Sequence, residues 1–161
     1  MAIAMLQPVI GKTAPDFSLP CTSGETVTLR QFKGKKTLVL YFYPNDDTPG
    51  CTKEACQFRD LELDFNDVGA VIYGVSADDM ESHKKFQYKH QLGFHLLSDV
   101  DAATCKAYGV WKQKNLYGKK FMGIERTTFI IDKTGRVAQI YPKVKVEGHV
   151  AEVLAFLRDE D

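Results

Sequence analysis

The sequence predicts an α/β fold with a mixed central β-sheet and helices on both of its faces. Residues 37–44, TLVLYFYP, form a nearly unbroken apolar run, which is typical of a strand buried on both faces. A helical pattern follows, and then a second apolar run, AVIYGVS, at residues 70–76. Strand, helix and strand with short links make a βαβ unit, so these two strands are expected to be parallel. Two strand-like segments within residues 127–141 then favour a mixed sheet.

Local patterns predict the elements before and after the first long strand. Residues 16–19 and 26–29 flank the turn residues Ser23 and Gly24, which indicates a short N-terminal β-hairpin. After the first long strand, apolar side chains recur at helical spacing, as expected of a helix that packs on the sheet. The stripe consists of Cys51, Ala55, Phe58, Leu61 and Phe65.

The second half of the chain predicts three more helices and a hairpin. Helical patterns cover residues 79–91, 101–108 and 147–158. The segments 127–132 and 137–141 are joined by a short turn that contains glycine, which predicts a β-hairpin. A hairpin and a helix after the βαβ unit complete the sheet and its cover.

Composition and charge are those of an ordinary globular domain. The 161 residues are 44% hydrophobic and 26% charged, so we expect one domain, residues 1–161, with one core. The 21 basic residues equal the 21 acidic ones, which gives no indication of nucleic-acid binding. No apolar run approaches the roughly 20 residues of a membrane helix, and the start lacks the pattern of a secretory signal. We therefore expect a cytoplasmic protein and, without a sustained exposed apolar stripe, a monomer.

The stretch PNDDTPGCTKEAC, residues 44–56, holds two cysteines separated by four residues. Pro49 suits the first position of a helix because its φ is fixed and its missing N–H has no partner there. Thr48 is then the N-cap, a position that favours a hydroxyl acceptor. Cys51 becomes the third helical residue, where free backbone N–H groups and the helix dipole favour an anion. We therefore expect Cys51 to be a reactive thiolate at the end of a central strand.

The cysteine pair could also be structural, metal-binding or part of a dithiol exchanger. A cysteine is more often a small buried apolar residue than a nucleophile. A dithiol exchanger normally has two residues between its cysteines, not four. A zinc site needs further ligands at short spacing, and the remaining cysteines and histidines form no such pattern: Cys21, Cys105, His83, His90, His95 and His149. We expect Cys21 and Cys105 to be structural and Cys105 to be the more exposed.

PNDDTPGC resembles the active-site pattern of the peroxiredoxins, which is Pro, three residues, Thr, two residues and Cys. TKEAC, with its cysteine five residues on, is similar to the branch called bacterioferritin comigratory protein or peroxiredoxin Q. The similarity runs from about Leu6 to the C-terminal helix and includes FSLP, VLYFYP, LLSD, YGVW and GIERTTFIID. It implies a thioredoxin-like fold and a thiol peroxidase that reduces hydrogen peroxide and organic hydroperoxides.

The resemblance implies a role for each residue near the nucleophile. Cys51 matches the peroxidatic cysteine, which attacks the O–O bond. Thr48 matches the threonine that contacts the sulfur and the peroxide, and Pro44 the proline that shields the pocket. Arg126 matches the arginine that holds the thiolate and the peroxide oxygens, and Glu54 the carboxylate that orients it. Taken alone, Arg126 would be a surface charge and Glu54 an ordinary acid in the first turn of a helix.

The resemblance also implies how the enzyme is reset. Cys56 matches the resolving cysteine, which would form an intramolecular disulfide with Cys51. Some members carry the resolving cysteine on the next helix, but this sequence has no cysteine between residues 57 and 104. The implied reductant is thioredoxin, and no metal, flavin or haem is needed. Two other functions stay open: a protein dithiol exchanger, and a redox sensor or chaperone that uses the pair as a switch.

Overall fold

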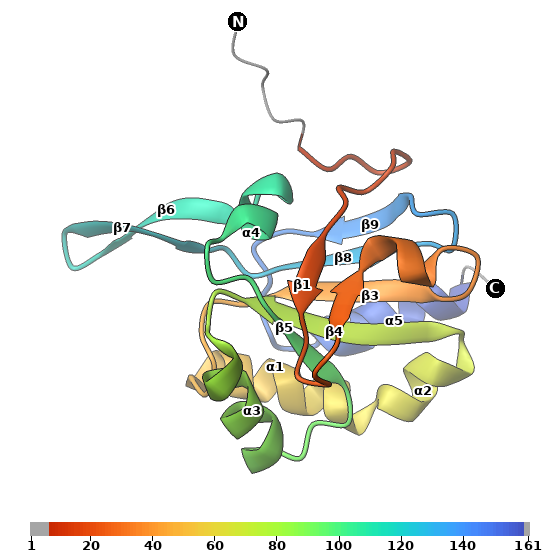
Figure 1. The fold of residues 1–161 in the computed structure, drawn as a ribbon, viewed down its shortest axis with the longest axis horizontal. Helices are drawn as coiled ribbons and strands as arrows, with labels where there is room; N and C mark the ends of the chain where they lie inside the picture. The colour runs from red at the N-terminus through yellow and green to blue at the C-terminus, as the bar shows by residue number, and fades with distance from the viewer. Residues whose placement is uncertain (1–6, 160–161) are drawn as a thin grey trace, which may run out of the picture.

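A five-stranded mixed sheet with the strand order β5-β4-β3-β8-β9 forms the centre of the molecule. The structure is a computed structural model that describes residues 7–159 (Figure 1). β3, β4 and β5 are parallel, whereas β8 and β9 each run antiparallel to their neighbours, which confirms the βαβ unit and the hairpin. The strands are β3 (Thr37–Phe42), β4 (Ala70–Ser76), β5 (His95–Ser98), β8 (Thr127–Ile131) and β9 (Val137–Tyr141).

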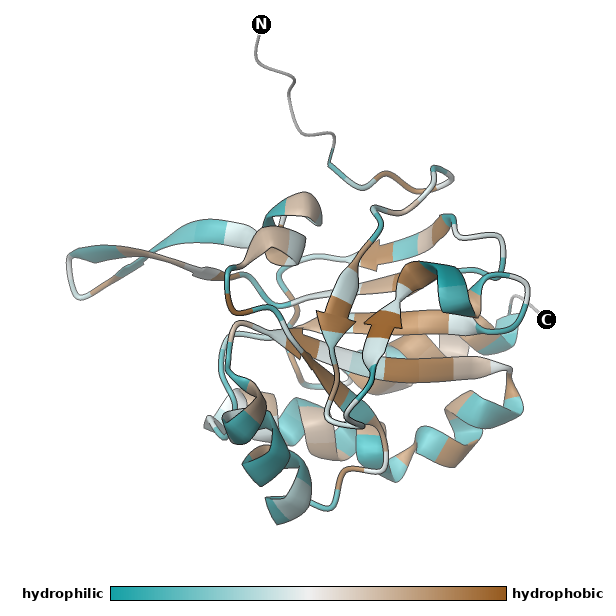
Figure 2. Ribbon diagram, in the orientation of Figure 1, coloured by the Kyte–Doolittle hydropathy of each residue, from teal (hydrophilic) through white to brown (hydrophobic). Residues whose placement is uncertain are grey.

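β3 is the central strand because its apolar side chains fill two cores in alternation. Leu38, Leu40 and Phe42 pack into one core, and Val39 and Tyr41 into the other. All five are at most 1% exposed, as the unbroken apolar run predicts. In Figure 2 the central strands are among the segments with the most hydrophobic colouring.

Helices cover both faces of the sheet, as predicted, but unevenly. One core lies under four helices: α1 (Pro49–Asp60), α2 (Glu62–Asp67), α3 (Met80–Lys89) and α5 (His149–Asp159). The other lies under the N-terminal hairpin and two short helices: β1 (Ser18–Pro20), β2 (Thr26–Thr28), the 3₁₀ helix η1 (Leu29–Phe32) and α4 (Ala103–Ala107). No helix within residues 7–159 is long and apolar enough to cross a membrane.

The predicted apolar stripe after β3 is divided between two helices instead of one. α1 and α2 meet at Leu61, where φ is −108° and ψ is 9°, away from helical values. Leu61 is only half-buried, whereas Phe58 and Phe65 on either side are fully buried, with ring centroids 5.7 Å apart. The chain changes direction at Leu61, and both aromatic rings still reach the same core.

Three features were not predicted: the 3₁₀ helix η1, strand β5, and a hairpin made of β6 (Trp111–Leu116) and β7 (Lys119–Ile124). The hairpin projects from the body of the molecule in Figure 1, and its strands are mostly exposed, so they show no regular apolar alternation. Its two turn residues, Tyr117 and Gly118, have φ of 52° and 79°. Two consecutive positive φ values are the mark of a type I′ turn, which matches the twist of a hairpin.

The two cysteines outside the pair are both buried, so the expectation of a more exposed Cys105 is wrong. Cys105 is 0% exposed and Cys21 is 2% exposed. The backbone N–H of Cys105 donates to Asp99 Oδ2 at 2.7 Å. Burial, together with the nearby Asp99 carboxyl, raises the pKa of the Cys105 thiol far above its ordinary value. Both cysteines therefore have structural positions, and Cys105 is in its inert thiol form.

Candidate active site

The candidate site lies at the carboxyl end of β3, where the chain leaves the sheet for α1. The antiparallel strand β8 begins beside this end, because Thr127 pairs with Phe42, the last residue of β3. Arg126 directly precedes Thr127, so the sheet topology brings it to the first turn of α1. It contacts Cys51, which lies 75 residues earlier in the chain. The carboxyl ends of central strands are where open α/β folds place their sites.

Cys51 is the third residue of α1, after Pro49 at the first position, as predicted. Its side chain is buried, with 1% of the residue exposed. Arg126 Nη2 donates a hydrogen bond to Cys51 Sγ at 3.3 Å. The first turn of α1 and a guanidinium thus both meet the sulfur, and each provides a favourable place for negative charge.

Thr48 is the N-cap residue of α1, as predicted, but its hydroxyl does not cap the helix. Thr48 Oγ1 instead donates to the carbonyl oxygen of Asn45 at 3.2 Å, and the Thr48 carbonyl accepts from the N–H of Thr52 at 2.8 Å. The lone pairs of the hydroxyl oxygen therefore stay available to another donor. Pro44 is half-buried in the same loop, two residues after β3 ends.

Arg126 and Glu54 form a buried ion pair, so neither is the ordinary surface charge that it would be alone. Glu54 lies in the second turn of α1 and is fully buried. Arg126 Nη1 donates to Glu54 Oε1 at 2.6 Å, and the arginine side chain is 15% exposed. One guanidinium therefore contacts the carboxylate and the sulfur through different nitrogens, which fixes its orientation at Cys51.

The electrostatics of this pair are set by burial and by mutual attraction. Burial raises the pKa of Glu54 to about 7, although Arg126 acts in the opposite direction. Burial lowers the pKa of Arg126, but Glu54 and Cys51 outweigh it and leave that pKa above its ordinary value. Arg126 therefore stays charged, and Glu54 is the group of the pair that can gain a proton near neutral pH.

Glu54→Gln is expected to change how stability depends on pH. The pKa of Glu54 rises from 4.5 to about 7 on folding, so the folded protein keeps a proton that the unfolded chain releases between these values. The free energy of unfolding of the wild type should therefore fall as pH rises through this window, by up to about 3 kcal/mol, and level off above it. The amide does not titrate, so the variant should lack this component. Urea unfolding of both reduced proteins from acidic to neutral pH measures the difference.

Glu147→Gln is the matched control, because the side chain of Glu147 is 89% exposed. Its unfolding curve should follow that of the wild type at each pH. If the Glu54→Gln protein and the wild type change in parallel across the window, Glu54 does not take up the proton on folding.

A residue that no sequence pattern singled out lies beside Glu54. His149, the first residue of α5, lies with Nε2 4.0 Å from Glu54 Oε2. The same Nε2 is 2.8 Å from Thr128 Oγ1. Burial, and then the charge of Arg126, lower the pKa of His149 to about 4, so the ring is neutral at neutral pH. Among residues 7–159, Glu54 Oε2 has no hydrogen-bond partner, which is consistent with the raised pKa of Glu54.

Cys56 lies on the same helix as Cys51, five residues further on, and is half-buried. Both cysteines are free thiols. The structure thus places all six of the predicted residues on α1, on the loop before it or directly before β8. It shows that Arg126 contacts both Cys51 and Glu54.

One group within the described part of the chain brings potential metal ligands together: Asp46, Asp78 and His83, with ligand atoms within 4.8 Å of one another. Both ring nitrogens of His83 are already engaged, with Asp46 Oδ2 at 2.7 Å and with the carbonyl oxygen of Leu97 at 2.9 Å. We therefore interpret the group as a hydrogen-bonded network beside the site.

Comparison with known proteins identifies the family. Residues 10–140 match the sequence model described as "AhpC/TSA family". The chain belongs to this family. Within it, the chain is 53% identical to the "Putative peroxiredoxin bcp" of Coxiella burnetii, over 92% of this chain and 97% of the relative. It is 54% identical to "Peroxiredoxin Bcp" of Bacillus subtilis, over 93% and 95%.

A solved structure of an AhpC/TSA family relative also has the same fold. A cysteine-to-serine mutant of PrxQ from Xylella fastidiosa matches with a TM-score of 0.90 and 38% identity, over 96% of this chain and 98% of that chain. This protein of the AhpC/TSA family is therefore a peroxiredoxin of the bacterioferritin comigratory protein, or peroxiredoxin Q, branch, with the thioredoxin-like fold. Its activity is that of a thiol peroxidase.

Proposed function

We propose that Cys51 is the peroxidatic cysteine and that Cys56 resolves it in an intramolecular disulfide, which thioredoxin then reduces. The observation that carries the proposal is the 3.3 Å contact between Arg126 Nη2 and Cys51 Sγ at the start of α1. The substrates proposed are hydrogen peroxide and organic hydroperoxides. In support of the second class, one similar structure is titled as an insight into the alkyl peroxide reduction activity of a Xanthomonas campestris protein.

The first step transfers one oxygen atom to sulfur. The Cys51 thiolate attacks one oxygen of ROOH, the O–O bond breaks with its electron pair going to the distal oxygen, and a proton completes the alcohol ROH. Cys51 becomes a sulfenic acid. Arg126 can stabilise both the thiolate and the negative charge that develops on oxygen. Thr48 can hydrogen-bond in the same pocket, which Pro44 helps to shield.

The second step forms the disulfide and releases water. The Cys56 thiol attacks the sulfur of the sulfenic acid, an S–S bond replaces the S–O bond, and the hydroxyl leaves as water. A dithiol of thioredoxin then returns both cysteines to thiols by exchange. Because both cysteines belong to one helix, the cycle needs only one chain, and we propose that the protein acts as a monomer. A reducing cytoplasm would supply the reductant.

A coupled assay tests this function against its two alternatives. The purified protein is given hydrogen peroxide, thioredoxin, thioredoxin reductase and NADPH, and peroxide loss is followed together with NADPH oxidation. Consumption of peroxide together with oxidation of NADPH supports the peroxidase. A dithiol exchanger would reduce an added protein disulfide and leave the peroxide. A redox sensor would react once and then stop.

Arg126→Ala is expected to slow the reaction with peroxide on the order of 10²-fold, because the developing negative charge loses its fixed donor. Rapid-quench mass spectrometry of oxygen addition to Cys51 measures the rate. Arg158→Ala is the control, since the Arg158 side chain is 56% exposed and pairs with Asp64 on α2. An unchanged rate in Arg126→Ala would show that the arginine has only a structural role.

Disulfide formation is expected to open the first turns of α1. On a regular helix, Cα atoms five residues apart are roughly 8.6 Å apart, by about 1.5 Å rise and 100° rotation per residue. A disulfide requires about 4.4–6.8 Å. Hydrogen exchange should therefore show protected amides in α1 of the reduced protein and a loss of protection around Cys51 and Cys56 after oxidation. Equal protection, with the disulfide verified by mass, would contradict this opening.

A further inference from the structure

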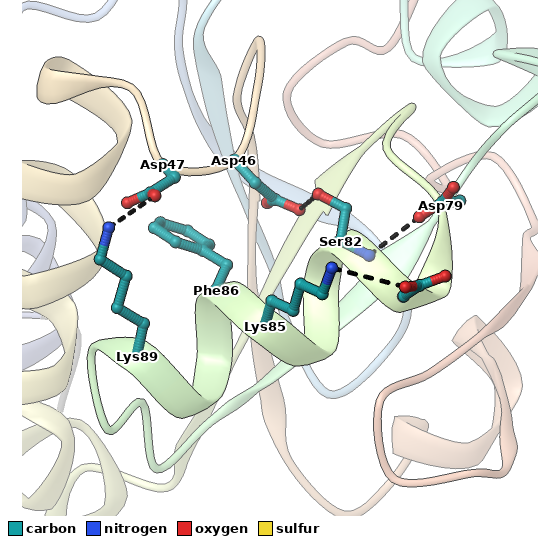
Figure 3. A pocket seen from close by; sticks show the side chains of 8 residues that line it. Asp46, Asp47, Asp79, Ser82, Lys85, Phe86 and Lys89 are labelled. Carbon is teal, nitrogen blue, oxygen red and sulfur yellow. Dashed lines mark hydrogen bonds and ion pairs between the residues drawn. The ribbon is translucent and has the colours of Figure 1, made fainter.

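The loop between β3 and α1, residues 43–48, is tied to α3 by two consecutive aspartates. Asp46 Oδ2 lies 2.7 Å from His83 Nδ1, and Asp47 Oδ1 lies 3.0 Å from His90 Nε2. Figure 3 shows Asp46 and Asp47 facing α3 from this loop. The pairs differ in burial: the His83 and Asp46 side chains are 0% and 4% exposed, and those of His90 and Asp47 are 19% and 46% exposed.

The inner pair is held by further hydrogen bonds on each side. Asp46 Oδ1 accepts from the Tyr43 hydroxyl at 2.6 Å, and Asp46 Oδ2 accepts from Ser82 Oγ at 2.7 Å. His83 Nε2 lies 2.9 Å from the carbonyl oxygen of Leu97 on β5. Both ring nitrogens of His83 therefore lie within hydrogen-bond distance of an oxygen, one on the loop and one on the sheet. The buried His83 side chain on α3 therefore joins the loop to the helix and to the sheet.

The backbone of the loop is also held by hydrogen bonds to the segment that follows β4. The N–H of Asp46 donates to Asp78 Oδ2 at 2.8 Å, and Ser76 Oγ donates to the same oxygen at 2.6 Å. Asp47 adopts the left-handed conformation with φ of 61°, which aspartate tolerates better than most residues. Thr48 follows at once, and Cys51 is three residues beyond Thr48. A displacement of Asp46 would therefore be passed directly to the residues that line the pocket.

We propose that His83 is a positioning residue for the reaction of Cys51 with peroxide. Through its contact with Asp46, His83 fixes the position of the loop that carries Thr48 and leads into α1. His83 contacts neither the sulfur nor Arg126 and acts only through this loop. The inference rests on the proposed role of Cys51 and adds a contact that keeps Thr48 and the start of α1 in the reactive geometry. Misplacement of catalytic groups by about 1 Å can cost on the order of 10²-fold in rate.

The test compares His83→Gln with His90→Gln, its counterpart in the outer pair. Both are made in a Cys56→Ser background, so that the oxidised Cys51 is trapped. Rapid-quench mass spectrometry gives the rate at which Cys51 reacts with hydrogen peroxide. Alkylation of Cys51 by iodoacetamide gives its general reactivity, because this reagent has no O–O bond that the site must orient. We expect His83→Gln to slow the peroxide reaction by about 10- to 100-fold and to leave alkylation nearly unchanged. His90→Gln should change neither rate.

A conservative variant separates positioning from a general loss of structure. The amide nitrogen of asparagine can take the place of Nδ1, and that of glutamine the place of Nε2. His83→Asn thus keeps the donor to Asp46 and should recover much of the rate that His83→Gln loses, whereas His83→Gln keeps only the donor to Leu97. If His83→Gln does not fold, Asp46→Ala replaces it, because this variant removes the same contact from the side of the loop. Asp47→Asn is its control.

The outcomes are distinct. A peroxide rate in His83→Gln equal to that of the background protein would overturn the proposal, as would an equal fall in the peroxide and iodoacetamide rates. Failure of Cys51 to become oxidised in the Cys56→Ser protein itself would instead overturn the proposed function.

Discussion

Cys51→Ser is expected to lose peroxide turnover with thioredoxin, by on the order of 10⁴-fold or more, as removal of a covalent nucleophile does in other enzymes. A serine hydroxyl in this place is not ionised near neutral pH and is a much poorer nucleophile than a thiolate. The surrounding groups cannot compensate, because Arg126 and the helix N-terminus stabilise an anion that the variant does not form. NADPH oxidation in the coupled assay measures the loss.

Cys21→Ala serves as the control for the change of a buried cysteine, because Cys21 is 2% exposed and lies in the core on the other face of the sheet. Its turnover should stay close to that of the wild type. Turnover near the wild-type level in Cys51→Ser would mean that another cysteine attacks the peroxide and that the contact with Arg126 does not mark the nucleophile.

Cys56→Ser is expected to reduce about one equivalent of peroxide per chain and then stop. The first step needs only Cys51, but the sulfenic acid finds no thiol with which to form an intramolecular disulfide. The other two cysteines are buried in the opposite core, so the described structure offers no replacement. Quenched samples should contain one added oxygen on Cys51, which dimedone labels, and steady NADPH oxidation with thioredoxin should disappear.

Cys105→Ala is the control for Cys56→Ser, because Cys105 is fully buried and its removal leaves Cys51 and Cys56 intact. This variant should turn over many equivalents. Sustained turnover by Cys56→Ser with thioredoxin alone, and no disulfide to another cysteine of the chain, would show that Cys56 is not the resolving residue.

The strands that fill the core on both sides were the most predictable part of the fold. The segment 137–141, which is β9 (Val137–Tyr141), was predicted from its hairpin turn, because this edge strand is mostly half-buried. The segment 70–76 was predicted as a strand from its apolar run, and β4 is Ala70–Ser76. Burial on both faces leaves an apolar run that needs no knowledge of its neighbours. The start of α1 was equally local, since the fixed φ of Pro49 suits the first helical position, although the Thr48 hydroxyl does not cap the helix. The β6–β7 hairpin lacks such a pattern because its side chains face solvent.

The contacts of the site could not be predicted in the same way. Helix geometry placed Cys51, but the meeting of Arg126 with Glu54 depends on which strand lies beside β3, and only the family resemblance suggested it. His83 and His149 gave no signal at all. Their importance comes from burial against Asp46 and Glu54, which are distant in sequence. Single histidines carry no pattern that distinguishes a buried partner from a solvated side chain.

The interruption at Leu61 limits how far the opening of α1 can spread. Helix formation is cooperative, so the loss of one turn withdraws support from the next. Here α2 is a separate helix with its own buried anchor, Phe65, and does not rely on continuous hydrogen bonding from the cysteines. The conformational change of each catalytic cycle can therefore remain a sub-global event, at a free-energy cost well below that of global unfolding. If α1 opens at each turnover as proposed, this boundary would protect the rest of the fold from unfolding with it.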